Sequence, residues 1–320
     1  MRRSKSIILL MLIVVVVLLL FLFLFQKQEA DDGNGDQSQA NNNTIYYEDK
    51  AYIYNSNIQN ILFLGIDNDD KLHTQEYPSN AGQADCIMVL SVNKADQTTR
   101  ILQISRNAMT DVDIFDLNGN YFSSIEAQLA TQYAYGNGTD TSCWATKRTV
   151  EELLYNLPIS GYFALDISAV SKVNDMLGGV TITIPEDYTM IDPAFVKGET
   201  ITLTGEQAEK YVRYRDQSTL GSNDQRMERQ IQYIPALLEA MRNKLEGSKE
   251  SLEDFLNEIS PYMVTDLDVN TMEELFRRNW KIGKAVYVPG KTKMGEQYEE
   301  FHVDKDALKR ILIELYYLQK

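Results

Sequence analysis

The sequence predicts an α/β domain with a mixed sheet, preceded by a helix that spans a membrane. Residues 7–25 form an uncharged run of 19 apolar residues. Beyond it, short apolar runs that are typical of buried strands alternate with amphipathic helical segments. Because strands and helices are intermixed and no repeat is evident, we interpret residues 58–320 as one α/β domain.

The N-terminal region predicts an anchor followed by a tether. The run at 7–25 contains no glycine or proline and is long enough to cross a bilayer. Basic residues precede it and acidic residues follow it, so residues 1–6 are expected in the cytoplasm and the domain outside the cell. A cleaved signal peptide is the alternative, although the run is long for one. Residues 26–57 are expected to be a polar tether and the start of the domain.

Composition excludes two classes of function. The net charge is −15 over 320 residues, which disfavours nucleic-acid binding because counterion release requires a basic surface. The chain has only two cysteines, Cys86 and Cys143, and two histidines, His73 and His302, with no zinc-ligand spacing. Outside the cell the two cysteines either pair or remain buried free thiols, and the sequence leaves both possibilities open.

The pattern of apolar residues places the elements of the domain. Strands are predicted at 60–67, 85–93, 100–105, 162–167, 180–185 and 284–290. Helices are predicted at 125–138, 146–157, 168–179, 204–215, 223–245, 251–263, 270–280 and 305–319. Ser168 and Thr204 are expected to cap the N-termini of their helices, with glycine ending the first of these. Pro235 is expected to kink or split the helix at 223–245.

Arginines are concentrated in one segment of this acidic chain. Arg213 and Arg215 share a face if the segment is extended, and Arg226, Arg229 and Gln230 share a face of the following helix. Planar guanidinium groups directed at one point suit a phosphate or pyrophosphate. A solvated face of salt bridges with neighbouring acids is the alternative.

Charged residues also stand at the ends of three predicted strands. Asp67 ends the first strand, Asp85 opens the second, and Arg106 follows the third. Ligands of α/β proteins bind at such strand ends. The sequence therefore predicts that these side chains share one site.

Six segments resemble, in order, the motifs of LytR-CpsA-Psr (LCP) proteins, also known as cell envelope-related transcriptional attenuators. They are NILFLGID, ADCIMVLSVN, ILQISRN, TVEELLYNLPISGYFALDISAVSKVNDMLGGVTITIP, LTGEQAEKYVRYR and DQRMERQ. The resemblance implies a three-layer α/β/α sandwich with a central mixed sheet and an apolar groove for a polyprenyl chain. Aliphatic residues of the helices at 168–179 and 231–245 either line that groove or pack in the core.

The resemblance implies a phosphotransferase on the outer face of a bacterial cell membrane, held there by a single span. Such an enzyme moves a glycopolymer (teichoic acid, capsule or similar) from an undecaprenyl-pyrophosphate carrier to peptidoglycan. The absence of a DNA-binding signature in an extracellular domain argues against direct promoter binding, so no nucleic-acid partner is expected.

The matching positions imply roles for individual residues. Arg106, Arg213, Arg215 and Arg226 would grip the pyrophosphate. Asp67 and Asp85 would hold Mg²⁺ or Mn²⁺, and loop or helix capping is their alternative role. Asp224 would act as a base toward a sugar hydroxyl, although it lies two residues before Arg226 where the family has three. The remaining polar positions expected to contact the substrate are Arg229, Gln230, Gln83 and Asn107.

Two positions depart from the family pattern. Gln83 replaces the arginine of the family's Arg-x-Asp motif, and Asn107 replaces the acid of its Pro-Arg-Asp motif. Each loss of charge would lower the rate by about 10²-fold or more. A catalytically weakened protein that binds the lipid carrier or acts as a scaffold is therefore the alternative. Hydrolysis of the carrier pyrophosphate is a third possibility.

Overall fold

The computed structural model describes residues 44–68, 71–75, 81–116, 119–216, 218–245, 249–277, 281–283 and 285–320. The predicted cytoplasmic tail, the transmembrane helix at 7–25 and most of the tether lie outside these described residues. Within the described ranges, no helix is long and apolar enough to cross a membrane.

The chain forms two compact units, a small one at its ends and a main one at Asn55–Tyr317. In the small unit, strands β1 (Thr44–Tyr47) and β2 (Lys50–Tyr54) form an antiparallel hairpin. β2 is next to β16 (Tyr317–Gln319) in a three-stranded sheet.

The main unit is built on a mixed sheet, as predicted. Its order is β11-β8-β3-β4-β5-β12, and β13 also pairs with β5. β3, β4 and β5 are antiparallel neighbours, whereas β8 runs parallel to β3. The strands are β3 (Ile58–Asp67), β4 (Gln83–Asn93), β5 (Thr98–Ile104), β8 (Gly161–Asp166), β11 (Met263–Thr265), β12 (Lys281–Ile282) and β13 (Val286–Tyr287).

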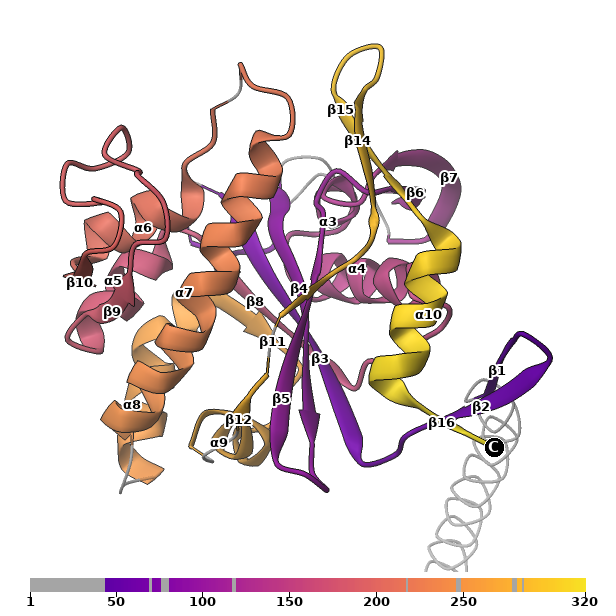
Figure 1. Cartoon of the computed structure of the whole chain (residues 1–320), viewed down its shortest axis with the longest axis horizontal. Coiled ribbons are helices and arrows are strands. Elements are labelled where there is room, and N and C mark those ends of the chain that lie inside the picture. The colour runs from indigo at the N-terminus through magenta and orange to yellow at the C-terminus, as the bar shows by residue number, and fades with distance from the viewer. Residues whose placement is uncertain are drawn as a thin grey trace, which may run out of the picture. The chain divides into compact units, whose positions relative to one another are not determined.

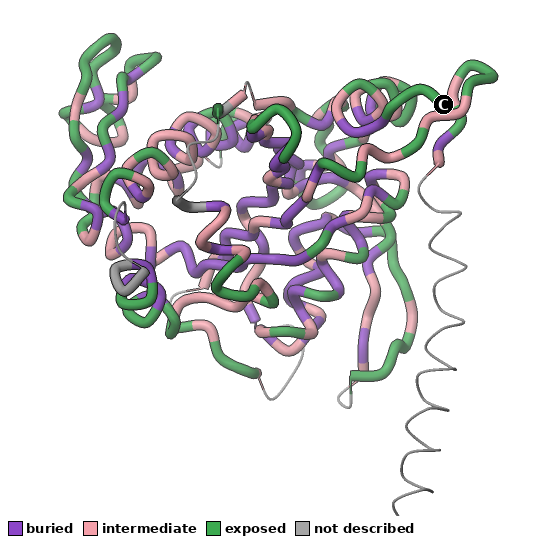
Figure 2. The backbone as a smooth tube through the Cα atoms, turned by 90° about the horizontal axis from the view of Figure 1, so that it is seen from below, coloured by how far each residue is buried: buried purple, intermediate pink, exposed green. Residues whose placement is uncertain are grey.

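Helices lie on both faces of this sheet, which explains why its central strands are nearly continuous apolar runs. Figure 1 shows α7 and α10 on opposite sides of β3 and β4, and most residues of these two strands are buried, as the purple parts of Figure 2 indicate. Phe163 and Leu165 pack against Val173 of α5 and Met241 of α7. The helices on the face of the sheet that carries Phe163 and Leu165 are α5 (Ala169–Met176), α6 (Gly205–Arg213), α7 (Ser222–Leu245), α8 (Lys249–Ile259) and α9 (Val269–Arg277).

The other face carries α3 (Thr131–Ala134), α4 (Asp140–Leu153) and α10 (Lys305–Tyr316). Ser91 of β4 donates a buried hydrogen bond to the Tyr316 hydroxyl of α10 at 3.2 Å. The hydroxyl of Tyr162, the neighbour of Phe163 on β8, donates to Asp140 of α4 at 3.2 Å. Successive residues of a strand thus contact the two helical groups, because strand side chains alternate in direction.

Most predicted helix signals are confirmed. Thr204 caps α6 in a capping box with Gln207. Gly178 and Gly179 end α5 with φ values of 84° and 95°, which glycine adopts without steric cost. Ser168 occupies the N-cap position of α5 as predicted, but its hydroxyl donates to Asp166 and makes no capping bond to the helix. α7 runs through Pro235 as one helix of 24 residues, so the proline does not split it.

The predicted helix at 125–138 is largely wrong. Residues up to Gln128 belong to β7 (Tyr121–Gln128), which pairs antiparallel with β6 (Met109–Phe115). Pairing with β6 satisfies the backbone groups of this segment, and only the short helix α3 follows. The predicted strand at 284–290 is also shorter than expected, since β13 has two residues.

The remaining elements are two hairpins and a 3₁₀ turn. β9 (Val180–Thr183) pairs with β10 (Thr200–Leu203), and β14 (Gly290–Met294) pairs with β15 (Glu299–Val303). The turn, η1, covers Ser260–Tyr262. The hairpin of β14 and β15 was missed by the sequence analysis, and it supplies a residue to the site described below.

We expect Gly65→Ala to lower the free energy of unfolding by about 1–3 kcal/mol, the usual cost of overpacking. An added Cβ would lie 2.9 Å from the Cβ of Cys86 on the paired strand, and neither atom can move independently of its backbone. Urea unfolding measures the change. Gly65→Ala should cost less in a Cys86→Gly background than in the natural protein, and an unchanged midpoint for Gly65→Ala in the natural protein would contradict the packing argument.

Candidate active site

A bulge between β3 and β4 sets the position of the first carboxylate. Gly65 pairs with Cys86 and Ile66 pairs with Ala84, so Asp85 is the extra residue on β4. Such bulges redirect a side chain at the end of a strand pair. Asp67 ends β3 beside it, and Arg106 lies two residues beyond β5. The structure thus places Asp67, Asp85 and Arg106 at the same end of the sheet.

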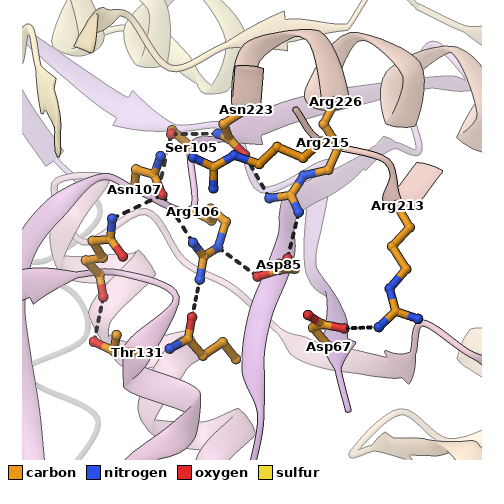
Figure 3. A network of polar contacts seen from close by, with 12 residues as sticks. Asp67, Asp85, Ser105, Arg106, Asn107, Thr131, Arg213, Arg215, Asn223 and Arg226 are labelled. Atoms are coloured by element: carbon orange, nitrogen blue, oxygen red, sulfur yellow. Dashed lines mark hydrogen bonds and ion pairs between the residues drawn. The ribbon is translucent and has the colours of Figure 1, made fainter. Parts of the chain in front are cut away.

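Asp85 is held between two arginines (Figure 3). Its Oδ1 lies 2.7 Å from Arg106 Nε, and its Oδ2 accepts from Arg226 Nη1 at 2.6 Å. The side chains of Arg106, Asp85 and Arg226 are only 10%, 13% and 4% exposed. Burial lowers the pKa of the Arg106 guanidinium, and the Asp85 carboxylate opposes that change. Removing the carboxylate would leave two charges buried beside each other without their partner.

Arg226 is fixed by a second polar chain that the sequence analysis missed. Its Nη2 donates to Asn223 Oδ1 at 2.8 Å, and Asn223 donates in turn to Ser105 Oγ at 3.2 Å. Asn223 and Arg226 are three residues apart on α7, a spacing that brings helical side chains together. That spacing was the available signal in the sequence.

Arg213 and Arg215 do not share an extended face, contrary to the prediction. Arg213 is the last residue of α6 and donates to Asp67 Oδ1 at 2.9 Å. The chain becomes extended at Tyr214, and Arg215 then donates to Ser222 Oγ at 3.1 Å and to Glu299 Oε2 at 2.8 Å. The change of backbone conformation between the two arginines directs each to a different carboxylate.

Arg229 and Gln230 are buried, each with a side chain engaged inside the protein. Arg229 donates to the Tyr211 carbonyl at 2.7 Å and to the Tyr214 carbonyl, with its guanidinium 5.3 Å from the Tyr188 ring centre. Gln230 donates to the Val212 carbonyl at 3.2 Å. Both residues are 3% exposed. Their hydrogen bonds hold the backbone that carries Arg213 and Arg215.

Gln83 and Asn107 both contact Arg106. The side-chain oxygen of Gln83, Oε1, accepts from Arg106 Nη2, and Asn107 Oδ1 accepts from Arg106 Nη1 at 3.3 Å. Asn107 is 1% exposed and also donates to Glu299 Oε2 at 3.2 Å. At both positions an amide group therefore supplies the acceptor for the same guanidinium group.

Glu299 of β15 is a site residue that the sequence analysis did not identify. Its side chain is 7% exposed and accepts from Arg215, Asn107 and the backbone N–H of Gly221. Nothing in its local pattern distinguishes it from the adjacent Glu300. Only the placement of the β14–β15 hairpin brings it to the arginines.

Asp224 lies in the first turn of α7. Burial, together with the nearby Glu299 and Glu228 carboxylates, raises its pKa. Its carboxylate has no hydrogen bond or ion pair to any other described residue. A raised pKa and a free carboxylate favour proton acceptance from a bound hydroxyl group.

The two cysteines are free and buried. Burial raises the pKa of the Cys86 thiol to about 12 and also raises that of Cys143. A thiol with such a pKa is almost fully protonated at neutral pH and is a poor nucleophile. We therefore assign neither cysteine a chemical role.

An apolar cavity leads from the interior toward the arginines. Its deep part lies between the sheet and α7, α8 and α9, with walls that include Phe63, Met88, Leu238 and Phe255. A second hollow shares Phe63, Leu165, Val173, Ile234 and Leu237 with it. That hollow extends to Cys86 and Gln230, the chain neighbours of Asp85 and Arg229. Residues of both predicted lipid-groove helices thus line the cavity.

Asp67 and Asp85 together make a donor set that suits Mg²⁺ only in part. Within the described ranges, no group of three or more His, Cys, Asp or Glu residues is placed to hold a metal ion. Mg²⁺ commonly binds one or two carboxylates and completes its shell with substrate phosphates and water. The pair therefore fits an ion shared with a phosphate ligand, and does not fit an ion held by protein alone.

Comparison with known proteins assigns the family. The LytR_cpsA_psr family model matches residues 20–315. The chain belongs to the LytR-CpsA-Psr family. The chain is 26% identical to the polyisoprenyl-teichoic acid–peptidoglycan teichoic acid transferase TagU of Halalkalibacterium halodurans. The match covers 67% of this chain and 63% of that protein. The chain is 25% identical to the transferase of the same name from Enterococcus faecalis, over 80% of the chain and 78% of that protein.

Solved structures support the LCP fold. The protein gbs0355 of Streptococcus agalactiae matches with a TM-score of 0.64 at 19% identity, over 80% of this chain and 87% of that one. TagU of B. subtilis matches with a TM-score of 0.56 at 22% identity, over 81% of this chain and 95% of that one. A structure of TagT bound to LIIa-WTA matches with a TM-score of 0.59 at 21% identity, over 81% of this chain and 90% of that one. At these identities the likeness establishes the mixed α/β fold alone.

We expect Asp224→Asn to stabilise the protein at pH 7. The carboxyl pKa is raised in the folded state, so its charge opposes folding above that pKa and has no effect where both states are protonated. Urea unfolding at pH 7 and pH 3 measures the difference, which should vanish at the lower pH. Asp216→Asn is the matched control and should lower the stability at pH 7, because a hydrogen bond from Ser218 lowers the Asp216 pKa. A lower midpoint for Asp224→Asn at pH 7 would contradict the assignment.

We expect Arg229→Lys to destabilise the fold by about 1.5–3 kcal/mol, the range for hydrogen bonds to charged groups. Lysine keeps the charge but cannot reach the Tyr211 and Tyr214 carbonyls with one planar group. Urea unfolding tests this expectation. Arg242→Lys, on the same helix and 4.0 Å from Glu239, is the control and should be nearly neutral. Equal midpoints for the two variants would show that the carbonyl contacts do not matter.

Proposed function

We propose that this protein transfers a phosphate-linked glycopolymer, such as teichoic acid or capsule, from an undecaprenyl-pyrophosphate carrier to peptidoglycan. One observation carries the proposal: a mostly apolar cavity extends to the chain neighbour of Asp85, the carboxylate that two arginines of a four-arginine cluster share. A polyprenyl pyrophosphate has the same two parts, an apolar chain and an anionic head. The names of the teichoic acid transferase relatives support the same substrate class.

In the proposed reaction, a peptidoglycan sugar hydroxyl attacks the phosphorus atom that is linked to the glycopolymer. The new P–O bond forms as the bond to the bridging oxygen breaks, and polyprenyl phosphate leaves with that oxygen. Asp224 accepts the hydroxyl proton. Arg106, Arg213, Arg215 and Arg226 stabilise the negative charge of the transferred and departing phosphates.

The existing ion pairs prepare the arginines for this role. Asp67, Asp85 and Glu299 hold guanidinium groups in place before a ligand binds. Fixed donors stabilise developing charge without the cost of reorganising during the reaction. Asp67 and Asp85 would hold Mg²⁺ or Mn²⁺ with the phosphates, and the ion would supply further charge neutralisation.

The location belongs to the same proposal. Residues 7–25 would anchor the chain in the cell membrane as a single span, with the N-terminus in the cytoplasm and the domain outside. There the domain, built as the three-layer sandwich expected of the family, would meet both the lipid carrier and the peptidoglycan.

The alternative is a protein that binds the carrier without efficient transfer. Gln83 and Asn107 favour it, because amide groups stand where the family has an arginine and an aspartate. Robust transfer by the natural protein would exclude this alternative, whereas carrier binding without transfer would favour it.

We expect Arg213→Ala to lower the transfer rate by about 10²–10³-fold, the usual effect of removing one donor to a developing charge. Its side chain is 39% exposed, so the fold should survive. The assay is transfer from a short-chain polyprenyl-pyrophosphate glycan to peptidoglycan oligomers, with the full chain in detergent and Mg²⁺ present.

The matched control is Arg148→Ala, because Arg148 is 46% exposed and pairs with Glu152 on α4. This variant should transfer at the natural rate. Addition of EDTA should abolish transfer by the natural protein. Natural protein that neither binds the carrier nor transfers the glycan would refute the proposed function.

A further inference from the structure

Glu299 connects the C-terminal hairpin to the arginine cluster through three contacts. Its Oε2 accepts from Arg215 Nη2 at 2.8 Å and from Asn107 Nδ2 at 3.2 Å, and its Oε1 accepts from the Gly221 N–H at 2.9 Å. The side chain is 7% exposed. Gln128 also donates to the Glu299 backbone carbonyl at 2.7 Å, which fixes the strand itself.

Two of these contacts hold both ends of one loop. Arg215 precedes the loop and Gly221 ends it, just before α7 begins at Ser222. Ser222 contributes a further acceptor to Arg215 at 3.1 Å. A single carboxylate therefore fixes the guanidinium of Arg215 and the backbone turn that leads into α7 with Asp224 and Arg226.

The third contact determines which residue can stand at position 107. Asn107 Oδ1 faces two donors, Arg106 Nη1 at 3.3 Å and Gln128 Nε2 at 3.2 Å, whereas its Nδ2 faces the Glu299 carboxylate. A guanidinium has no acceptor and a carboxylate has no hydrogen to donate. The amide is thus held in one orientation by a cation on one side and an anion on the other.

We propose that Glu299 is the positioning residue for Arg215 and that it requires an amide donor at position 107. Its carboxylate sets the guanidinium in place for the pyrophosphate, so this part rests on the proposed function. The requirement at position 107 rests on the contact alone. An aspartate there would place two carboxylates about one hydrogen-bond length apart in a buried site, where like charges repel strongly.

The departure at Asn107 then has a physical explanation. The cluster keeps an acid beside its arginines, but Glu299 of β15 supplies that acid in place of a residue in the turn after β5. Asn107 completes the arrangement because it accepts from Arg106 and donates to Glu299. Substituting aspartate at 107 alone would therefore add a second negative charge without restoring a lost function.

Unfolding of the full chain in detergent tests the requirement at position 107. We expect Asn107→Asp to lower the unfolding temperature, and we expect the double variant Asn107→Asp with Glu299→Gln to unfold at a higher temperature than Asn107→Asp alone. Glutamine at 299 removes one of the two carboxylates that would face each other, and with it their repulsion. A double variant no more stable than Asn107→Asp would overturn this part of the proposal.

Binding of farnesyl pyrophosphate, measured by calorimetry at a temperature where each variant is folded, tests the positioning of Arg215. We expect Glu299→Gln to weaken binding about tenfold, and Glu299→Asp to weaken it less. The control Glu300→Gln removes the adjacent charge on β15, which contacts His302, and should bind normally. Natural affinity in Glu299→Gln would overturn the positioning role.

The Arg215→Ala background separates positioning from a general structural role. If Glu299 acts through Arg215, then Glu299→Gln should cause no further loss of affinity in that background. A further tenfold loss would mean that Glu299 acts by another route and would overturn the proposal. If the natural chain does not bind farnesyl pyrophosphate, the proposed function and the positioning role both fail, while the unfolding comparison still decides the requirement at position 107.

Discussion

The site depends on one carboxylate shared by two buried guanidinium groups. Asp85 contacts Arg106 at 2.7 Å and Arg226 at 2.6 Å, and the three residues come from β4, the segment after β5, and α7. Two guanidinium groups this close repel each other in a medium of low polarity unless an anion lies between them. The carboxylate therefore decides how closely α7 can approach the ends of the central strands.

α7 carries polar site residues near its N-terminus and apolar cavity residues further along its length. Its N-terminal turns carry Asp224 and Arg226 into the polar cluster, while residues further along, such as Ile234 and Leu237, line the apolar cavity. One helix thus contributes to both kinds of surface, with the change occurring within about two turns. A ligand with an apolar chain and an anionic head matches this gradient better than a wholly polar substrate does.

The sequence predicted those site residues whose positions follow from the pattern of neighbouring residues in the chain. Asp67, Asp85 and Arg106 could be placed together because each stands at the end of an apolar run, and strand ends in one sheet meet at one edge. The functions of Arg229 and Gln230 could not be separated from that of Arg226, because helical spacing gives all three a shared face. Their partners differ, because the carbonyls at the end of α6 accept hydrogen bonds from Arg229 and Gln230, whereas Arg226 pairs with Asp85.

By itself the sequence determined the mixed α/β class, most helix boundaries and the concentration of arginines in one segment. These features follow from periodicity, capping residues and charge, which act over a few neighbouring residues. The tertiary structure alone decided that Ile125–Gln128 is a strand, that Arg213 and Arg215 face different carboxylates, and that Glu299 joins the site. Each of these depends on a partner far away in the chain, because a hydrogen bond or ion pair between distant segments exists only once the fold has brought them together.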